Sequence, residues 1–189
     1  AQASSCKVDS FKQPKIDNYN QMDLLFVIDT SGSIQKEKKD IANQIDTFIK
    51  RLPRDFDLQI GVVLAHGKRS KYSGRLYKTN KKNEPVVLRS PQMSLENIRK
   101  HLYHKLTITK TDPKGGGELG LYSLNKIFEN DRFQEARKHG FFRQTAPLGV
   151  VFVSDENDIC AVYPTGAKVS MNSHERSAFY DNCGVFEKV

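Results

Sequence analysis

The sequence predicts an α/β fold with a doubly wound, mostly parallel central sheet flanked by helices. Apolar runs of strand length alternate with amphipathic stretches of helix length, and two of the apolar runs end on an aspartate. Alternation of this kind is typical of parallel sheets whose strands are joined by right-handed helical crossovers. The 189 residues suffice for one domain with a single core.

The first elements are expected between residues 23 and 65. Residues 23–28, DLLFVI, form an apolar run of the kind found in strands that are covered on both faces. Apolar residues then recur at helical spacing from Ile34 to Leu52, and Pro53 ends this helix. A second apolar and β-branched run, at residues 58–65, predicts the next strand.

The later elements are less regular. Residues 72–89 contain two short apolar segments around TNKKNE, which predicts a β-hairpin or an exposed excursion. Ser94 is the expected cap of a helix over residues 94–106. Residues 148–153 form the third apolar strand. Further helices are expected from about Glu118, around 132–139 and near 172–180.

The chain is basic, with 30 Lys and Arg against 22 Asp and Glu and a net charge of +8. These basic residues are scattered and no nucleic-acid-binding motif is present, so no specific nucleic-acid partner is expected. The densest basic stretch, Lys68 to Lys82, is the best candidate for an interaction surface, although a solvated hairpin accounts for it more simply.

The three cysteines bear on the cellular compartment. Cys160 and Cys183 are close enough in sequence to form a disulfide in an oxidising compartment, and two cytosolic thiols are the alternative. Cys6 follows AQASS, as the acylated cysteine of a bacterial lipoprotein follows small residues; a free or buried thiol is the other interpretation. No apolar run approaches the roughly 20 residues of a membrane helix. We expect an exported protein, periplasmic or on the cell surface, whose only membrane link would be a lipid on Cys6.

The turn after the first strand carries oxygen donors at alternate positions. It reads D-x-S-x-S, with Asp29, Ser31 and Ser33. Carboxylate and hydroxyl oxygens are hard donors suited to Mg²⁺, Ca²⁺ or Mn²⁺, and Gly32 is expected to let the backbone bend sharply between them. Taken alone, the motif favours a simpler interpretation, in which a serine caps the next helix and the aspartate accepts backbone N–H bonds.

Two further segments favour the metal interpretation. The later strand ends in VFVSDEND, which brings Asp155 to the same sheet edge, because the carboxyl ends of parallel strands lie together. A glycine-rich loop, KGGGELGL, precedes a helix between the two strands. Together with D-x-S-x-S, these segments resemble the von Willebrand factor type A domain, the I domain of integrins, over roughly residues 20–160. GGGELGL with FFRQTAPLGVVFVSDENDIC is similar to a group of exported bacterial proteins of this kind, often lipoproteins.

The resemblance implies a Rossmann-like type A domain with a metal-ion-dependent adhesion site, for Mg²⁺ or for Ca²⁺ or Mn²⁺. Ser31 and Ser33 would bind the metal directly, and Asp29 and Asp155 directly or through water. The domain would span residues 23–189 after a leader of residues 1–22, and the family's last strand and helix would be missing.

The middle loop departs from the family's pattern. The threonine that usually supplies a metal oxygen would fall near Gly115, so Glu118 is the predicted replacement, with Thr111 as the fallback. Three ionised carboxylates would then surround one dication, which makes a partner's own carboxylate a less favourable ligand than in integrins. We therefore expect Glu118 to tighten the metal or to fill the coordination position that an acidic partner would take.

Structural roles are expected for several polar residues near these motifs. Glu156 and Asp158 are expected to hold their loop by hydrogen bonds, with a second cation as the alternative. Arg143 and Thr145 are expected to pack at their places before the third strand, with contact with a partner as the alternative. His101 and His104 lie three apart on a predicted helix; with no carboxylate or cysteine partner in view, they are expected to be surface residues and not a zinc site.

We expect a divalent-metal-dependent ligand-binding or adhesion module of an exported bacterial surface protein, with a protein or glycan on a surface as its partner. One alternative is a scaffold component of an envelope assembly with a purely structural metal. The other is a metal-dependent phosphoesterase, which would need more aspartate and histidine ligands. No nucleophile and base are paired in the motifs, so an enzyme is not expected.

Overall fold

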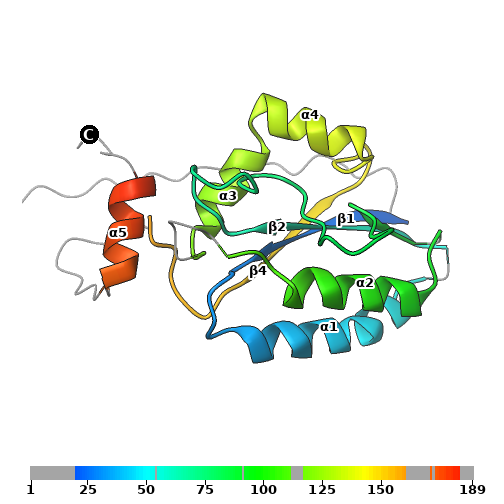
Figure 1. Ribbon diagram of the computed structural model, residues 1–189. Coiled ribbons are helices and arrows are strands. Elements are labelled where there is room, and N and C mark those ends of the chain that lie inside the picture. Colours follow the sequence, from blue (N-terminus) through cyan, green and yellow to red (C-terminus); the bar gives the residue numbers. More distant parts are fainter. Residues whose placement is uncertain are drawn as a thin grey trace, which may run out of the picture.

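The protein has an α/β fold in which a mixed four-stranded sheet carries helices on both faces (Figure 1). The structure is a computed structural model, and it describes residues 20–53, 55–90, 92–111, 117–160, 171 and 173–183. Its elements are β1 (Gln21–Ile28), α1 (Gln35–Lys50), β2 (Asp57–Leu64), β3 (Leu88–Arg89), α2 (Leu95–Thr107), α3 (Gly120–Ile127), α4 (Asn130–Lys138), β4 (Leu148–Val153) and α5 (Ser173–Asn182).

The sheet has the strand order β3-β2-β1-β4. The central strand β1 pairs in parallel with β2 along its whole length and with β4 over six residues, Asp23 to Ile28. The short β3 is antiparallel to β2. All side chains of β1 from Asp23 to Ile28 are buried, as expected for a strand with neighbours on both sides and helices on both faces. The carboxyl ends of β1, β2 and β4 therefore lie at one edge.

Two hydrophobic cores separate the layers. Helices α1 and α2 cover one face and α3 and α4 the other (Figure 1). Ile45 and Leu102 belong to the larger core, on the α1 and α2 side. Ile127 and Phe141 belong to the second core. Helix α2 begins as predicted, because the Ser94 side chain accepts a hydrogen bond from the Asn97 backbone N–H.

The segment between β2 and β3 is not a hairpin. Between Leu64 and Leu88 it contains no strand, and its backbone groups pair mostly within short turns. It is not an exposed excursion either, because Tyr77 and Glu84 are buried. The Tyr77 hydroxyl donates to the Ile108 carbonyl, so the segment folds back onto the end of α2.

Arg143 joins the amino ends of the strands. Its backbone N–H and its Nε donate to the two carboxylate oxygens of buried Asp23, over 2.7 Å and 2.8 Å. Its guanidinium also bonds the side chain and the carbonyl of Asp57 and the carbonyl of Met22. The expected packing role of Arg143 is confirmed: it fastens β1 to β2 at the edge opposite the candidate site.

Candidate functional site

Asp29 lies buried at the carboxyl end of β1 and connects this strand to β4. Its backbone N–H donates to the Val153 carbonyl over 2.9 Å. One carboxylate oxygen accepts the Ser31 N–H over 2.6 Å, and the other accepts the Ser154 hydroxyl over 2.8 Å. The turns that follow the two strands are therefore joined through a single carboxylate, which is a hydrogen-bonded anion with little contact with water.

The serines of the turn do not cap helix α1. The N-cap of α1 is Ile34, and no side chain makes a cap hydrogen bond there. The Ser31 and Ser33 hydroxyls instead lie 3.1 Å apart and bond each other. The capping interpretation is therefore wrong for the serines, because the two hydroxyls point toward each other and not toward the first N–H groups of α1.

Gly32 does not have the expected role. Its φ lies outside the left-handed region, and a Cβ added there would meet no atom within 4 Å. A Cβ is therefore compatible with this position, and the turn does not depend on the conformational freedom of glycine.

The described end of the glycine-rich loop, Gly117 to Leu119, packs directly on this turn. The Thr30 N–H donates to the Gly117 carbonyl over 3.1 Å. Gly117 has φ +86°, and a Cβ on it would lie 2.0 Å from the Thr30 hydroxyl oxygen. The next residues are held as well, because the Leu119 N–H donates to the Ala65 carbonyl and the Ile159 N–H to the Glu118 carbonyl. Residues 117–119 are thus fixed to the segments that follow β1, β2 and β4.

A cavity of about 230 Å³ lies at this edge, and two of the predicted site residues line it, Asp29 and Glu118. Asp155 is exposed and is not part of its lining, and Thr111 is exposed. Gly115 lies outside the described residues. The complete lining is Val27, Asp29, Ala65, Glu118, Gly120, Leu121, Phe152, Ser154, Glu156, Asn157 and Asp158.

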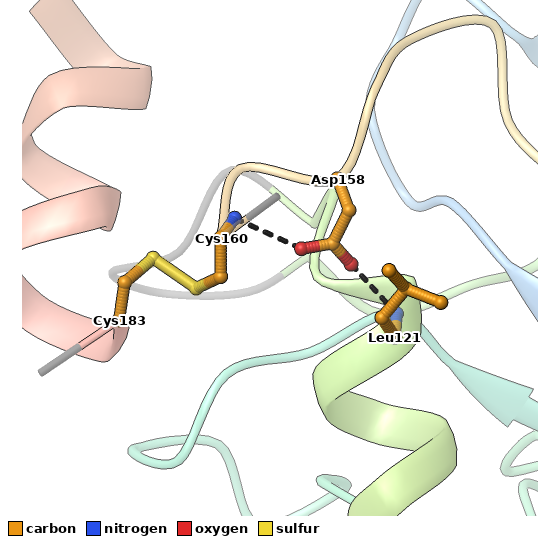
Figure 2. The surroundings of a disulfide bond; sticks show 4 residues. All are labelled: Leu121, Asp158, Cys160 and Cys183. Carbon is orange, nitrogen blue, oxygen red and sulfur yellow. Dashed lines mark hydrogen bonds between the residues drawn. A yellow bond between two sulfur atoms is a disulfide. The ribbon is translucent and has the colours of Figure 1, made fainter. Parts of the chain in front are cut away.

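Asp158 holds the loop after β4, as expected. Its carboxylate accepts the Leu121 N–H over 2.6 Å at the start of α3 and the Cys160 N–H over 2.9 Å (Figure 2). Cys160 is bonded to Cys183, which confirms the predicted disulfide and ties α5 to this loop (Figure 2). Structural disulfides form outside the reducing cytosol, so the pairing indicates an oxidising compartment. No helix in the described ranges is long and apolar enough to cross a membrane. Cys6 lies outside the described residues.

A buried lysine beneath the site was not anticipated from the sequence. Lys38, in the first turns of α1, is fully buried, and its Nζ has no hydrogen-bond partner among the described residues. Burial lowers the pKa of Lys38, and the nearby carboxylates of Asp29 and Asp155 oppose this shift. The ammonium therefore interacts with both aspartates that the sequence assigned to the metal.

A histidine that the motifs did not include also lies at this edge. His66 follows β2 and is fully buried. Its Nδ1 bonds the Ser70 hydroxyl, and its Nε2 lies 3.1 Å from the Thr30 hydroxyl and 3.0 Å from the Lys110 carbonyl. Both ring nitrogens are engaged by these contacts, so the imidazole links three segments and is not placed to act as a free base. The sequence does indicate the position of this histidine, because His66 directly follows the apolar run LQIGVVLA.

The interpretation of His101 and His104 as surface residues without a partner is wrong. Glu84, from the segment before β3, is buried against both imidazoles. The three side chains offer ligand atoms that all lie within 4.8 Å of one another, close enough to hold a metal ion. Sequence reasoning missed this group because the carboxylate comes from a segment whose fold the apolar pattern did not predict.

Comparison of the chain with models of known protein families, with curated proteins and with solved structures gave no match.

Proposed function

We propose that this protein is a divalent-cation-dependent binding module of the von Willebrand factor type A kind, exported and displayed in the periplasm or on the cell surface. The observation that carries the proposal is the Ser154 to Asp29 hydrogen bond beside the paired Ser31 and Ser33 hydroxyls. It gathers hard oxygen donors from two strand ends at one sheet edge, where α/β proteins commonly bind ligands.

The metal in this proposal is Mg²⁺, with Ca²⁺ or Mn²⁺ as its substitutes. Ser31 and Ser33 supply hydroxyl oxygens, and Asp29, Asp155 and Glu118 supply carboxylates directly or through water. A site with only oxygen donors suits these hard cations and disfavours zinc and copper. Glu118 takes the place of the family's threonine, and its position on the wall of the cavity with Asp29 supports this assignment.

Lys38 changes the charge balance that the motifs alone suggest. Three carboxylates around a dication leave one negative charge, and the buried ammonium beside Asp29 and Asp155 cancels it. A neutral site repels an acidic partner less than a negative one does. The partner in this proposal is a protein or a glycan presented on a surface, and Cys6 would supply a lipid anchor if it is acylated.

The metal is tested by titrating Mn²⁺ into chelator-treated protein, with bound and free Mn²⁺ distinguished by electron paramagnetic resonance. Wild type should bind Mn²⁺ and release it to excess Mg²⁺. Asp29→Ala and Ser33→Ala should lose most of the affinity, and Ser173→Ala, an exposed serine of α5, should keep it. Equal affinities in all four proteins would contradict the proposal.

The role of Glu118 needs a separate measurement. Calorimetry of Glu118→Ala with Mg²⁺ should show weaker binding if this carboxylate is a ligand, and an unchanged affinity would remove Glu118 from the site.

An EDTA experiment distinguishes a binding module from a scaffold component. A binding module should dissociate from glycan-coated or protein-coated surfaces in EDTA and bind again when Mg²⁺ is added. A scaffold should co-purify with a fixed partner in either condition.

A further inference from the structure

A second group of ligand atoms lies between α2 and the segment that precedes β3. The Glu84 Oε1 is 3.9 Å from the Nδ1 of His101 and 3.9 Å from the Nδ1 of His104. The Glu84 side chain is fully buried, whereas those of the two histidines are 21% and 15% exposed, so the group is open on one side only. Among the described residues, none of these three atoms has a hydrogen-bond partner.

The chain orients all three side chains toward one point. His101 and His104 stand one helical turn apart on the same face of α2. Glu84 is fixed from the other side, because its Oε2 accepts the Thr79 N–H, which leaves Oε1 directed at the imidazoles. The turn before Glu84 is formed at Asn83, whose φ of 63° is a conformation that asparagine tolerates better than most residues. Orientation of a ligand by an outer hydrogen bond is usual in metal sites.

Three buried polar atoms without partners are costly unless something bridges them. A hydrogen bond cannot do so at 3.9 Å, because N–H···O bonds span about 2.7–3.2 Å. A metal ion can. A tetrahedral zinc ion with bonds of about 2.0–2.1 Å holds its ligand atoms about 3.4 Å apart, so each imidazole needs to approach Glu84 by only about half an ångström.

We propose that Glu84, His101 and His104 form a binding site for a transition-metal dication, with Zn²⁺ as the best fit and at least one coordination position left to water. Two imidazole nitrogens and one carboxylate oxygen suit zinc, cobalt or nickel, whereas magnesium and calcium prefer oxygen ligands alone. The bound metal fastens the segment before β3, with part of the basic stretch Lys68 to Lys82, to helix α2.

The electrostatic surroundings keep the histidines in the form that binds metal. Burial lowers the pKa of both His101 and His104, and neighbouring lysines act in the same direction, while Glu84 opposes them. Neutral imidazole is the metal-binding form. The lysines that act on these histidines are Lys81, Lys100 and Lys105.

Lys81 competes with the metal. Its exposed Nζ lies 2.9 Å from the Nε2 of His104. An ammonium there donates to an unprotonated Nε2, which places the ring proton on Nδ1, the atom that must bind the metal. The lysine therefore has to leave before the metal enters. Its removal should strengthen binding, which a merely structural role for the histidines would not produce.

The site is tested by calorimetric titration of Zn²⁺ into chelator-treated, tag-free protein in a Cys6→Ser background, with Co²⁺ absorption as a report on nitrogen ligation. Wild type should bind one Zn²⁺ at this site. Glu84→Gln and His104→Gln should weaken binding by about 100-fold or more, whereas His139→Gln, at an exposed residue just after α4, should not. Lys81→Ala should bind Zn²⁺ more tightly than wild type. His104, whose side chain is partly exposed, keeps the test valid if Glu84→Gln fails to fold, which circular dichroism would show.

The outcome is independent of the proposed oxygen-donor site. Asp29→Ala should lose most of the Mn²⁺ affinity and leave zinc affinity unchanged. Zinc binding that survives both Glu84→Gln and His104→Gln, or that disappears with Asp29→Ala, would overturn the proposal.

Discussion

The Ser154 hydroxyl donates to the buried Asp29 carboxylate over 2.8 Å and joins two strand ends that lie 125 residues apart in the sequence. Hydrogen bonds to charged groups stabilise proteins by about 1.5–3 kcal/mol, and partial exposure of this one places it near the lower end. Ser154→Ala should therefore lower the free energy of unfolding of metal-free protein by about 1–2 kcal/mol. A double-mutant cycle with Asp29→Ala in urea should show that the two losses are not additive, and additive losses would contradict the interaction.

The contact of Gly117 with Thr30 predicts that alanine substitution at Gly117 and at Gly32 will have different effects on stability. Gly117→Ala should be destabilising by more than 1 kcal/mol, because its φ is positive and its Cβ would overlap the Thr30 hydroxyl. It should also weaken Mn²⁺ binding, since the loop that presents Glu118 has to move. Gly32→Ala meets open space and should leave stability nearly unchanged, so thermal unfolding of the two variants provides a matched comparison.

The buried ammonium of Lys38 opposes the entry of a dication. Lys38→Met keeps the length of the side chain and removes its charge, which leaves the repulsion between Asp29 and Asp155 for the metal to relieve. The Mg²⁺ affinity should rise by at least about tenfold, which corresponds to about 1.4 kcal/mol. Calorimetry measures this directly, and Lys39→Met, an exposed neighbour, is the control. Weaker binding by Lys38→Met would mean that the lysine supports the site by packing and not by charge.

Arg143 should be the most sensitive ion-pair position at the amino edge of the sheet. Its removal leaves the Asp23 carboxylate buried without its cation, and breaking a buried pair in this way costs about 3–5 kcal/mol. Arg143→Met should lower the urea midpoint accordingly. Arg132→Met breaks a more exposed pair with Glu135, at 3.5 Å, and should cost less than about 1 kcal/mol. Similar losses for both variants would contradict the role of Arg143.

Continuous apolar runs in the sequence predicted β1, β2 and β4 well, although the side chains of β4 are partly exposed. The strand over residues 148–153 has the predicted bounds, and β1 and β2 begin within two residues of their predicted starts. Ser94 caps α2 because a polar residue before an amphipathic run has a clear local role. These elements are determined by local patterns, which a single sequence contains.

The segment around Tyr77 and Glu84 shows where such patterns fail. Its apolar residues suggested strands, but only Leu88–Arg89 is one. Tyr77 packs in the core on the α2 side and Val87 in the core on the α3 and α4 side, while most of the segment's backbone hydrogen bonds form within short turns. Glu84 consequently reaches His101 and His104, which no spacing rule links to it. The turn after β1 was different: Ser31 and Ser33 stand two apart in the sequence, so the approach of their hydroxyls could be predicted, whereas the burial of Lys38 near Asp29 could not.

Lys105 should make stability depend on pH. It is fully buried, its Nζ donates to the Tyr77 carbonyl, and burial lowers its pKa to about 8, with Glu84 opposing the shift. The unfolded chain keeps the ordinary pKa of 10.5 and therefore binds more protons than the folded chain between about pH 8 and 10.5. The contribution of Lys105 to the free energy of unfolding should be constant below pH 8 and should rise by about 3 kcal/mol between about pH 8 and pH 10.5.

Urea unfolding of chelator-treated Cys6→Ser protein at pH 7, 8, 9 and 10 measures this effect by comparison with Lys105→Met. The stability of the wild type relative to the variant should increase with pH above 8, because only the wild type loses a buried charge. The range stops at pH 10, because burial raises the pKa of Tyr77 to about 12 and stability from that group falls above its ordinary value of 10.0. Parallel pH profiles for the two proteins would show that the Lys105 ammonium keeps its ordinary pKa in the fold.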